Sequence, residues 1–465
     1  MLIQEPASFI DDFVTSINEA IRKEHPSESL SRSQKAFISF CIMAILITNK
    51  VCWVSFQKSC VGKYTVASLS WMFRCSKIPW NYLLTMGVKV ILTRYNIKYG
   101  VLAVDDTDKK RSKVTKKLPF IHKLKDKSTG GYHNGQCLVF LILITPSAKI
   151  PISFNFYVPD PAVSSWNKTN EKLKKKGISA KNRPARPAKN HNYPTKIEIA
   201  LNLISQFANC FSSLVEIKAV VGDALYGTSK FLDGAQEILR INQVISQIRK
   251  NQNIRYRNKK ISVEQYFKQN KGVQQTIKIR GKKTKVIMNG LRVHLCSHNR
   301  KRFIIALKYE GEDEYRYIVA SDMTWRMIDI VEAYSLRWLI EVFIQDWKSY
   351  EGWNNRTKHP GKEGSSRSLI LSLLVDLCLF LYPLQLARFK NKLPAWTVGS
   401  LSEKIRKDSL ISTIEYILSS DKPKKRFKEL SKTLKELIAL APSDKHMINK
   451  ELGNLEPAPA LVYKR

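Results

Sequence analysis

Three acidic residues that lie far apart in the chain stand in contexts that could bring them together as a catalytic site. Asp106 and Asp223 each follow a short apolar run of strand length, and Glu341 lies in a long helix predicted for residues 324–350. Carboxylates at the ends of neighbouring strands, with one more from a helix packed on the sheet, can converge on two divalent cations about 4 Å apart. Such ions activate a water or a 3′-hydroxyl and stabilise the leaving oxygen, so the pattern favours phosphodiester chemistry.

The predicted helix around Glu341 carries a narrow polar stripe on a mostly apolar surface. At about 100° per residue, Tyr334, Arg337, Glu341 and Lys348 fall within an arc of roughly 60°. Because unpaired buried charge is expensive, such a stripe must face a partner, and a cleft that holds metal and phosphate would suit it. An internal ion pair between Arg337 and Glu341 explains the stripe equally well when the helix is considered alone. The two aspartates favour the catalytic interpretation.

Taken in order, these motifs resemble the DDE transposases of bacterial insertion sequences, specifically the insertion-sequence-4 family. The chain reads Asp-Asp-Thr at 105–107, Gly-Asp-Ala-Leu-Tyr-Gly at 222–227 and YSLRWLIEVFIQDWK at 334–348. The last segment matches the family signature Y-x-x-R-x-x-x-E-x-x-x-x-x-x-K at every fixed position. The resemblance covers about residues 100–390.

The resemblance implies that Asp106, Asp223 and Glu341 are the metal-binding catalytic carboxylates. Asp106 is preferred over Asp105 because the first aspartate of the family directly precedes threonine. On an alternating strand only one of these two neighbours can face the metals.

The resemblance also implies cofactors and partners. Two Mg²⁺ ions per active site are expected, with Mn²⁺ as a substitute. Water would free a 3′-hydroxyl at the transposon end, which would then attack target DNA in cut-and-paste transposition. The partners would be double-stranded DNA, as terminal inverted repeats and target, and a second copy of the chain in a synaptic homodimer. Tyr334, Arg337 and Lys348 would hold the phosphates of the DNA end.

The charge of the chain is unusual and independently favours nucleic acid as a partner. The 465 residues include 78 Lys and Arg against 39 Asp and Glu, a formal net charge of +39. A surface this positive attracts a polyanion, and counterion release strengthens that attraction at low salt. A ribosome-like scaffold or a protein on an anionic membrane surface are the plainer alternatives.

Membrane residence and zinc binding are not expected. The N-terminal MLIQEPASF has neither the basic nor the apolar part of a secretory signal, and the apolar runs are short or interrupted. We therefore expect a cytoplasmic protein, and the resemblance implies that it is bacterial and nucleoid-associated. The eight cysteines include no C-x-x-C pair, and His294, Cys296 and His298 are interpreted as ordinary strand residues.

The expected fold class is α/β, with a ribonuclease-H-like catalytic core and a β-rich insertion between helical N- and C-terminal regions. The predicted divisions are a helical N-terminal domain at 1–98, the first part of the core at 99–249, the insertion at 250–315, the second part of the core at 316–390 and a helical region at 391–465. The first is a candidate for DNA binding and the last for dimerisation.

Two segments need separate interpretation: one has two possible structures, and the other is predicted to be a loop. The helical pattern of residues 64–92 breaks at 76–79, which fits a helix-turn-helix and a plain packing domain equally well. Residues 164–192 carry nine Lys or Arg and a Pro- and Asn-rich end, a composition typical of a loop.

Three rival functions remain. A ribonuclease-H-like nuclease would share the metals but make nicks without joined DNA. A catalytically inactive transposase-derived protein would bind DNA without cutting it, although the complete triad argues against this. A basic scaffold protein would have no need for three convergent carboxylates.

Overall fold

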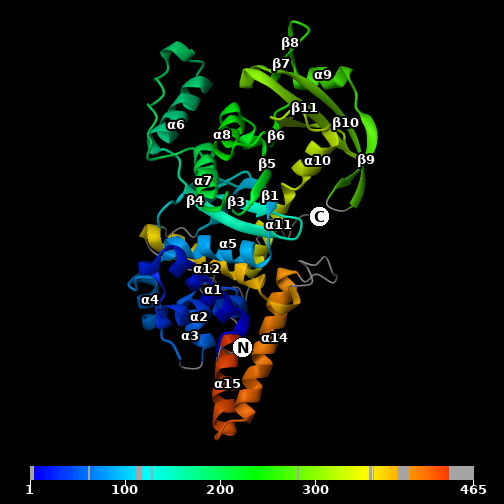
Figure 1. The fold of residues 1–465 in the computed structure, drawn as a ribbon. Helices are drawn as coiled ribbons and strands as arrows, with labels where there is room; N and C mark the ends of the chain where they lie inside the picture. Colours follow the sequence, from blue (N-terminus) through cyan, green and yellow to red (C-terminus); the bar gives the residue numbers. More distant parts are fainter. Residues whose placement is uncertain are drawn as a thin grey trace, which may run out of the picture.

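The computed structural model describes residues 5–60, 63–111, 118–126, 129–279, 282–355, 359, 361–385 and 397–438. Within this part of the chain, twelve strands form one mixed sheet, in which β4 and β9 pair beside the main path. The main path runs β2-β3-β1-β5-β6-β12-β11-β10-β7-β8. The chain therefore combines a mixed sheet with helices on both of its faces (Figure 1).

The first six strands of the chain form the part of the sheet that carries the aspartates. They are β1 (Tyr99–Lys110), β2 (His122–Lys125), β3 (Tyr132–Ile144), β4 (Lys149–Tyr157), β5 (Glu216–Gly222) and β6 (Val244–Ile248). β1 pairs antiparallel with β3, and β3 with β4, whereas β5 runs parallel to both β1 and β6. Residues 137–144 of β3 are continuously buried, as expected for a strand with helices on both faces.

The residues predicted to form a β-rich insertion extend the same sheet. It contains β7 (Asn253–Tyr256), β8 (Lys259–Ser262), helix α9 (Val263–Gln269), β9 (Val273–Ile279), β10 (Lys282–Leu295) and β11 (Arg300–Tyr309). The chain then returns to the central strands, because β12 (Arg316–Ala320) pairs with β6. β10 is one continuous strand of 14 residues.

Helices cover the central strands on both faces. α7 (Lys196–Phe211) and α8 (Ser229–Leu239) lie on one side, and α5 (Trp80–Arg94) and α12 (Gly361–Leu379) lie on the other (Figure 1). α11 (Trp338–Tyr350) shares the second face, where its Phe343 and Trp347 rings pack against Phe140 of β3. These contacts assign each face of β1 to a different helix.

The single helix predicted for 324–350 is divided in the structure. α10 (Met327–Ser335) and α11 are separated by Leu336 and Arg337, both with right-handed helical dihedral angles. Amides at 336, 337, 339 and 340 bond to the carbonyl three residues earlier, so a tighter 3₁₀-type turn joins the two helices. Apolar periodicity does not change across such a turn, which is why it was not anticipated.

The N-terminal region is a helical bundle that packs against α12. Its helices are α1 (Ser8–Glu24), α2 (Arg32–Thr48), α3 (Trp53–Ser59), α4 (Val66–Arg74) and α5. α2 begins at a capping box formed by Ser31 and Gln34, and residues 37–47 of it are buried. No single helix among the described residues is long and apolar enough to cross a membrane, although the bent pair of α2 and α3 passes that test jointly.

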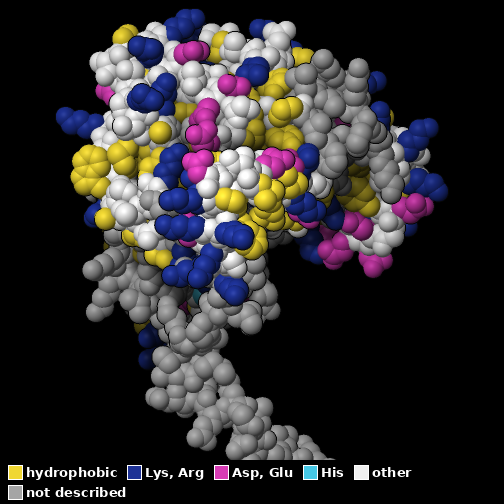
Figure 2. All heavy atoms as spheres, turned by 90° about the horizontal axis from the view of Figure 1, so that it is seen from below, with side chains coloured by type: hydrophobic (Ala, Val, Ile, Leu, Met, Phe, Trp, Pro, Cys, Tyr) yellow, Lys and Arg dark blue, Asp and Glu magenta, His cyan; other side chains and the backbone are white. Residues whose placement is uncertain are grey.

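Two further segments project from the body of the molecule. α6 (Pro161–Lys175) lies within the range predicted to be a loop, so that prediction is wrong for its first part. α14 (Val398–Leu418) and α15 (Pro423–Ile438) form a long pair at the opposite end (Figure 1). Figure 2 looks onto this end and shows Lys and Arg side chains spread widely over the visible surface. The predicted C-terminal region falls partly outside the described residues, at 391–396 and 439–465.

Candidate active site

Parallel pairing between β1 and β5 places the aspartates beside each other. The last paired residues are Val104 and Gly222, so Asp105 and Asp223 come directly after the end of this ladder. β1 itself continues to Lys110 because it stays paired with β3. The expectation that Asp106 ends a strand is therefore wrong, although the parallel ladder does end next to it.

Asp106 points to the face covered by α7. Its Oδ2 lies 2.6 Å from Nζ of Lys196, the first residue of α7, and 3.8 Å from the Sγ of Cys137 on β3. The same ammonium lies 5.3 Å from the centre of the Tyr157 ring. The carboxylate that was predicted to bind metal thus has an ammonium group as its nearest charged partner.

Asp105 points to the opposite face, towards α11. Its Oδ2 accepts a hydrogen bond of 3.1 Å from Nη1 of Arg337, and Nη2 of the same guanidinium donates to Oε1 of Glu341 at 2.5 Å. One arginine therefore links a carboxylate of the central strand to the predicted catalytic glutamate. Burial and the charge of Asp223 together raise the pKa of Asp105 to about 7, against the opposing effects of the Asp106 amide and Arg337.

Asp223 lies at the turn between β5 and α8, near both neighbouring aspartates. Its Oδ1 accepts a 2.9 Å hydrogen bond from the Leu225 amide, and its carbonyl accepts one of 2.6 Å from Ser246. Burial raises the pKa of Asp223, and the charge of Asp106 adds to that effect. A carboxyl group whose pKa is raised by burial and by a neighbouring carboxylate is typical of a cation-binding or catalytic site.

The remaining signature residues surround the same edge of the sheet. Burial raises the pKa of Tyr334 to about 12, and its hydroxyl lies 3.4 Å from Oε1 of Gln247 on β6. Glu341 is the most open of the carboxylates, with 47% of its side chain exposed. Burial lowers the pKa of Lys348, and the charge of Asp108 opposes that shift. Tyr334 is thus near Asp223, whereas Arg337 and Lys348 are near acidic groups of β1.

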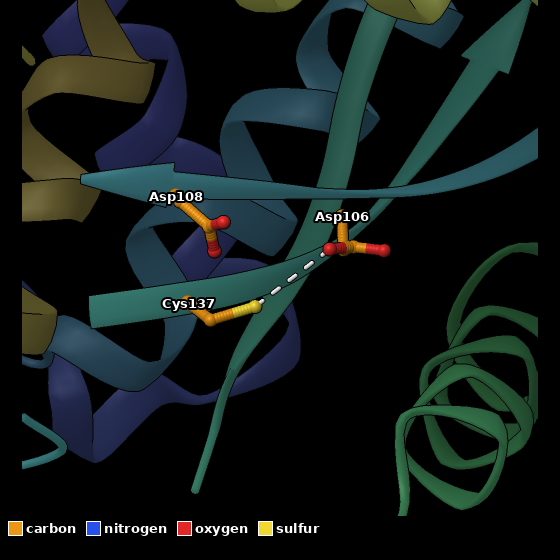
Figure 3. A group of neighbouring side chains, drawn as sticks. All are labelled: Asp106, Asp108 and Cys137. Atoms are coloured by element: carbon orange, nitrogen blue, oxygen red, sulfur yellow. Dashed lines mark hydrogen bonds between the residues drawn. The ribbon is translucent and has the colours of Figure 1, made fainter. Parts of the chain in front are cut away.

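The structure does not gather the three predicted carboxylates at ligand distance from one another. Among the described residues, one set of three potential metal ligands has its ligand atoms within 4.8 Å of one another: Asp106, Asp108 and Cys137 (Figure 3). Asp106 and Glu341 instead lie on opposite faces of β1, each held by a different basic side chain.

The donor chemistry of this edge fits a hard divalent cation in part. Carboxylate oxygens from Asp106, Asp108 and Asp223 are the ligands that Mg²⁺ and Mn²⁺ prefer. Cys137 does not fit, because a thiol must lose its proton to bind metal well and burial raises the pKa of Cys137 well above its usual range. Figure 3 shows its sulfur directed at Asp106 as a hydrogen-bond donor.

Several residues of this arrangement were not anticipated from the sequence. Strand alternation could have placed Asp108 on the face of Asp106, two residues away. Lys196 had no signal, because its contact with Asp106 depends on where α7 crosses the sheet. The link from Arg337 to Asp105 likewise required the packing of α11.

Comparison with protein families gives a match over part of the chain. Residues 185–374 match the family described as the transposase DDE domain, which supports a DDE transposase. This range includes Asp223, Arg337 and Glu341, but it begins after Asp105 and Asp106. A search of curated proteins found no match.

Proposed function

We propose that this protein is the transposase of a bacterial insertion sequence, which cuts and rejoins double-stranded DNA by a cut-and-paste route. The observation that carries the proposal is the junction of β1, β5 and α11. There the aspartates of two parallel strands meet a guanidinium that also holds Glu341. The match of residues 185–374 to a transposase domain supports the same function.

A ribonuclease-H-like core is part of this proposal. The strand order β4-β3-β1-β5-β6, with three antiparallel strands followed by two parallel ones, supports it. So does the position of α7 between β4 and β5 and of α8 between β5 and β6. The β-rich insertion then lies between the second aspartate and the glutamate helix.

We assign Asp106, Asp223 and Glu341 as the residues that would hold divalent metal, Mg²⁺ in the cell and Mn²⁺ as a substitute. Two bound ions would activate the attacking oxygen and stabilise the leaving one. Arg337 and Lys348 would bind the phosphates of the DNA end, and Arg337 holds Glu341 against the sheet. Tyr334 keeps its proton, so its hydroxyl can donate a hydrogen bond to a phosphate oxygen.

Asp105 competes with Asp106 for the role of first carboxylate. Asp105 shares a face of β1 with the helix of Glu341, whereas Asp106 faces α7. Side chains on the face of Glu341 need the smaller rearrangement to share an ion with it. Both aspartates must therefore be tested in parallel.

The decisive experiment is a panel of isosteric amide variants. Asp105→Asn, Asp106→Asn, Asp223→Asn and Glu341→Gln are compared for Mg²⁺-dependent cleavage of DNA that carries the ends of the element. Loss of a metal ligand removes several kcal/mol of transition-state stabilisation, so we expect about a 10³-fold slower rate at 106, 223 and 341. Asp105→Asn should cost about tenfold, through Arg337 alone.

The pattern of losses separates the assignments. A large loss at 105 with near-normal cleavage at 106 would transfer the role to Asp105. Normal cleavage by Glu341→Gln would reject the metal site altogether. Nicked but never joined products would support a nuclease, and DNA binding without any cleavage would support an inactive derivative.

The assembly and the compartment follow from the same proposal. A synaptic homodimer would pair two transposon ends and deliver them to target DNA in the bacterial cytoplasm. Mass measurement of the chain with and without end DNA would show whether two copies assemble.

A further inference from the structure

The segment between β4 and α7 forms a free-standing basic arm. In α6, the carboxylate of Asp160 caps the first turn through the Ala162 amide at 2.8 Å, and Pro161 occupies the first helical position. None of the residues of α6 is buried. Figure 1 shows the helix standing away from the sheet and from α7 and α8. Packing against the body of the protein therefore does not explain why this helix is ordered.

The segment that follows α6, at residues 176–192, packs along the helix and stabilises it. Nε1 of Trp166 donates to the Pro184 carbonyl at 2.8 Å, and Nη1 of Arg183 donates to Oδ1 of Asn170 at 3.0 Å. Val163, Trp166, Asn170 and Leu173 are half-buried, and they fall within about 80° on one side of the helix. The arm is thus a helix with a strap packed along one face.

The opposite face of the helix is a row of lysines. With Trp166 taken as zero, Lys168, Lys172 and Lys175 fall at about 200°, 240° and 180°. All three are exposed, and the described ion pairs include none of them. Residues 161–192 together hold nine Lys or Arg against one Glu. So many positive charges close together repel one another, and a bound polyanion would reduce that repulsion.

The base of the arm lies beside the aspartates. The arm leaves the sheet just after Tyr157 and returns just before Lys196, the residue that contacts both the Tyr157 ring and Asp106. α6 has 15 residues and so extends about 22 Å, the rise of roughly six base pairs. DNA bound at the candidate active site would therefore pass within reach of the lysine row.

We propose that the α6 arm grips the phosphate backbone of the DNA duplex flanking the cleavage site, through Lys168, Lys172 and Lys175. The proposal rests on the proposed function, because DNA is the polyanion that the carboxylate site would cut. The contact is independent of sequence and determines affinity and register, not the chemistry.

The test compares full-length variants in binding to a mixed-sequence duplex of about 40 base pairs, without divalent metal, over a series of salt concentrations. The Lys168→Gln/Lys172→Gln/Lys175→Gln variant should bind more weakly. The slope of log K against log salt should fall by about 3, close to 0.9 for each lost phosphate contact. The corresponding triple Arg variant should bind like the wild type.

A matched control removes the same net charge elsewhere. Lys268, Lys285 and Lys407 are exposed, and each is paired with a neighbouring carboxylate, so their replacement by Gln should change the slope little. An equal change of the salt slope in the control variant would mean that overall charge alone determines DNA affinity. That result would contradict the proposed role of α6. Three other results would also contradict the proposed role of α6. They are an unchanged salt slope in the arm variant, no DNA binding by the wild type, and an equal loss of affinity for a single-stranded RNA.

Cleavage separates this proposal from the proposed function. One outcome is that the arm variant binds DNA more weakly than the wild type while neither protein shows Mg²⁺-dependent cleavage. That result would support the DNA contact of α6 and contradict the transposase activity. If the wild type cleaves and the arm variant binds as tightly, the arm fails alone.

Discussion

At the scale of single residues, Arg337 is the side chain with most influence on the candidate site. Its two terminal nitrogens connect Asp105 and Glu341, which belong to elements more than 200 positions apart in the chain. The flat, forked guanidinium can serve two carboxylates at once, whereas an ammonium group is a single point of charge. The position of Glu341 therefore depends on the shape of this cation as well as on its charge.

Replacing Arg337 by Lys tests this dependence. We expect a cleavage rate about 10- to 100-fold lower, since one charged hydrogen bond contributes about 1.5–3 kcal/mol. DNA affinity should change less, because the positive charge is retained. Rates at saturating DNA check the prediction, and Arg326→Lys is the control, since Arg326 forms an exposed ion pair with Asp329. Wild-type rates in the Arg337 variant would contradict it.

At the scale of elements, the short turn after Asp223 positions that aspartate against β6. Gly227 ends the turn, and a Cβ added there would fall against the backbone carbonyl oxygen of Gln247. The absence of a side chain lets the turn lie directly on β6. The same approach allows the Gly227 carbonyl to meet Nε2 of His298 at 3.2 Å.

Gly227→Ala should therefore disturb both stability and the site. Forcing a methyl group against backbone costs about 1–3 kcal/mol, and relief requires the turn that carries Asp223 to move. We expect a lower free energy of unfolding by denaturant, together with slower cleavage. Gly131→Ala is the control, because the nearest atom to its added Cβ is 3.5 Å away, on Thr129. Equal stability of the two variants would reject the explanation.

At the scale of the whole molecule, a buried carboxyl group lies where α11 meets the helical bundle. Glu351 follows α11 and is fully buried, and the side chain of Asp376 on α12 lies close to its carboxyl group. Its carbonyl accepts a 2.6 Å hydrogen bond from Ser372 of α12. Burial raises the pKa of Glu351 well above its usual range, Asp376 and Asp346 raise it further, and Lys149 opposes them. Burial in the folded protein therefore favours the protonated form of Glu351.

The raised pKa of Glu351 makes the free energy of unfolding depend on pH. Above the ordinary glutamate pKa, the unfolded chain has released a proton that the folded chain keeps, so stability falls as pH rises, by up to about 1.4 kcal/mol per pH unit. Glu351→Gln should remove that slope and be more stable than the wild type at pH 8. Denaturant unfolding at pH 5 and pH 8 measures it, and Glu415→Gln, on the exposed side of α14, is the control. Parallel stability curves for the wild type and Glu351→Gln would contradict the prediction.

The local pattern of apolar and polar residues was enough to predict most helices and strands. The strongly apolar residues 32–48 form helix α2, and the strands before Asp105 and Asp223 lie where apolar runs of strand length placed them. α6 was missed because its lysines obscured a weak apolar stripe of Val163, Trp166 and Leu173, which is completed only by the returning strap. A helix whose partner is a nearby extended segment has little periodicity of its own to detect.

The sequence by itself determined which residues are available for chemistry, because residue type, strand alternation and spacing along a helix are local properties. It indicated the aspartates, Glu341 and their basic companions, and it predicted that Asp105 and Asp106 face opposite ways. Tertiary structure decided which helix covers each face: α11 reaches Asp105, and α7 brings Lys196 to Asp106. Helix placement depends on the packing of distant apolar side chains, such as Trp347 against Phe140, and no local pattern encodes that choice.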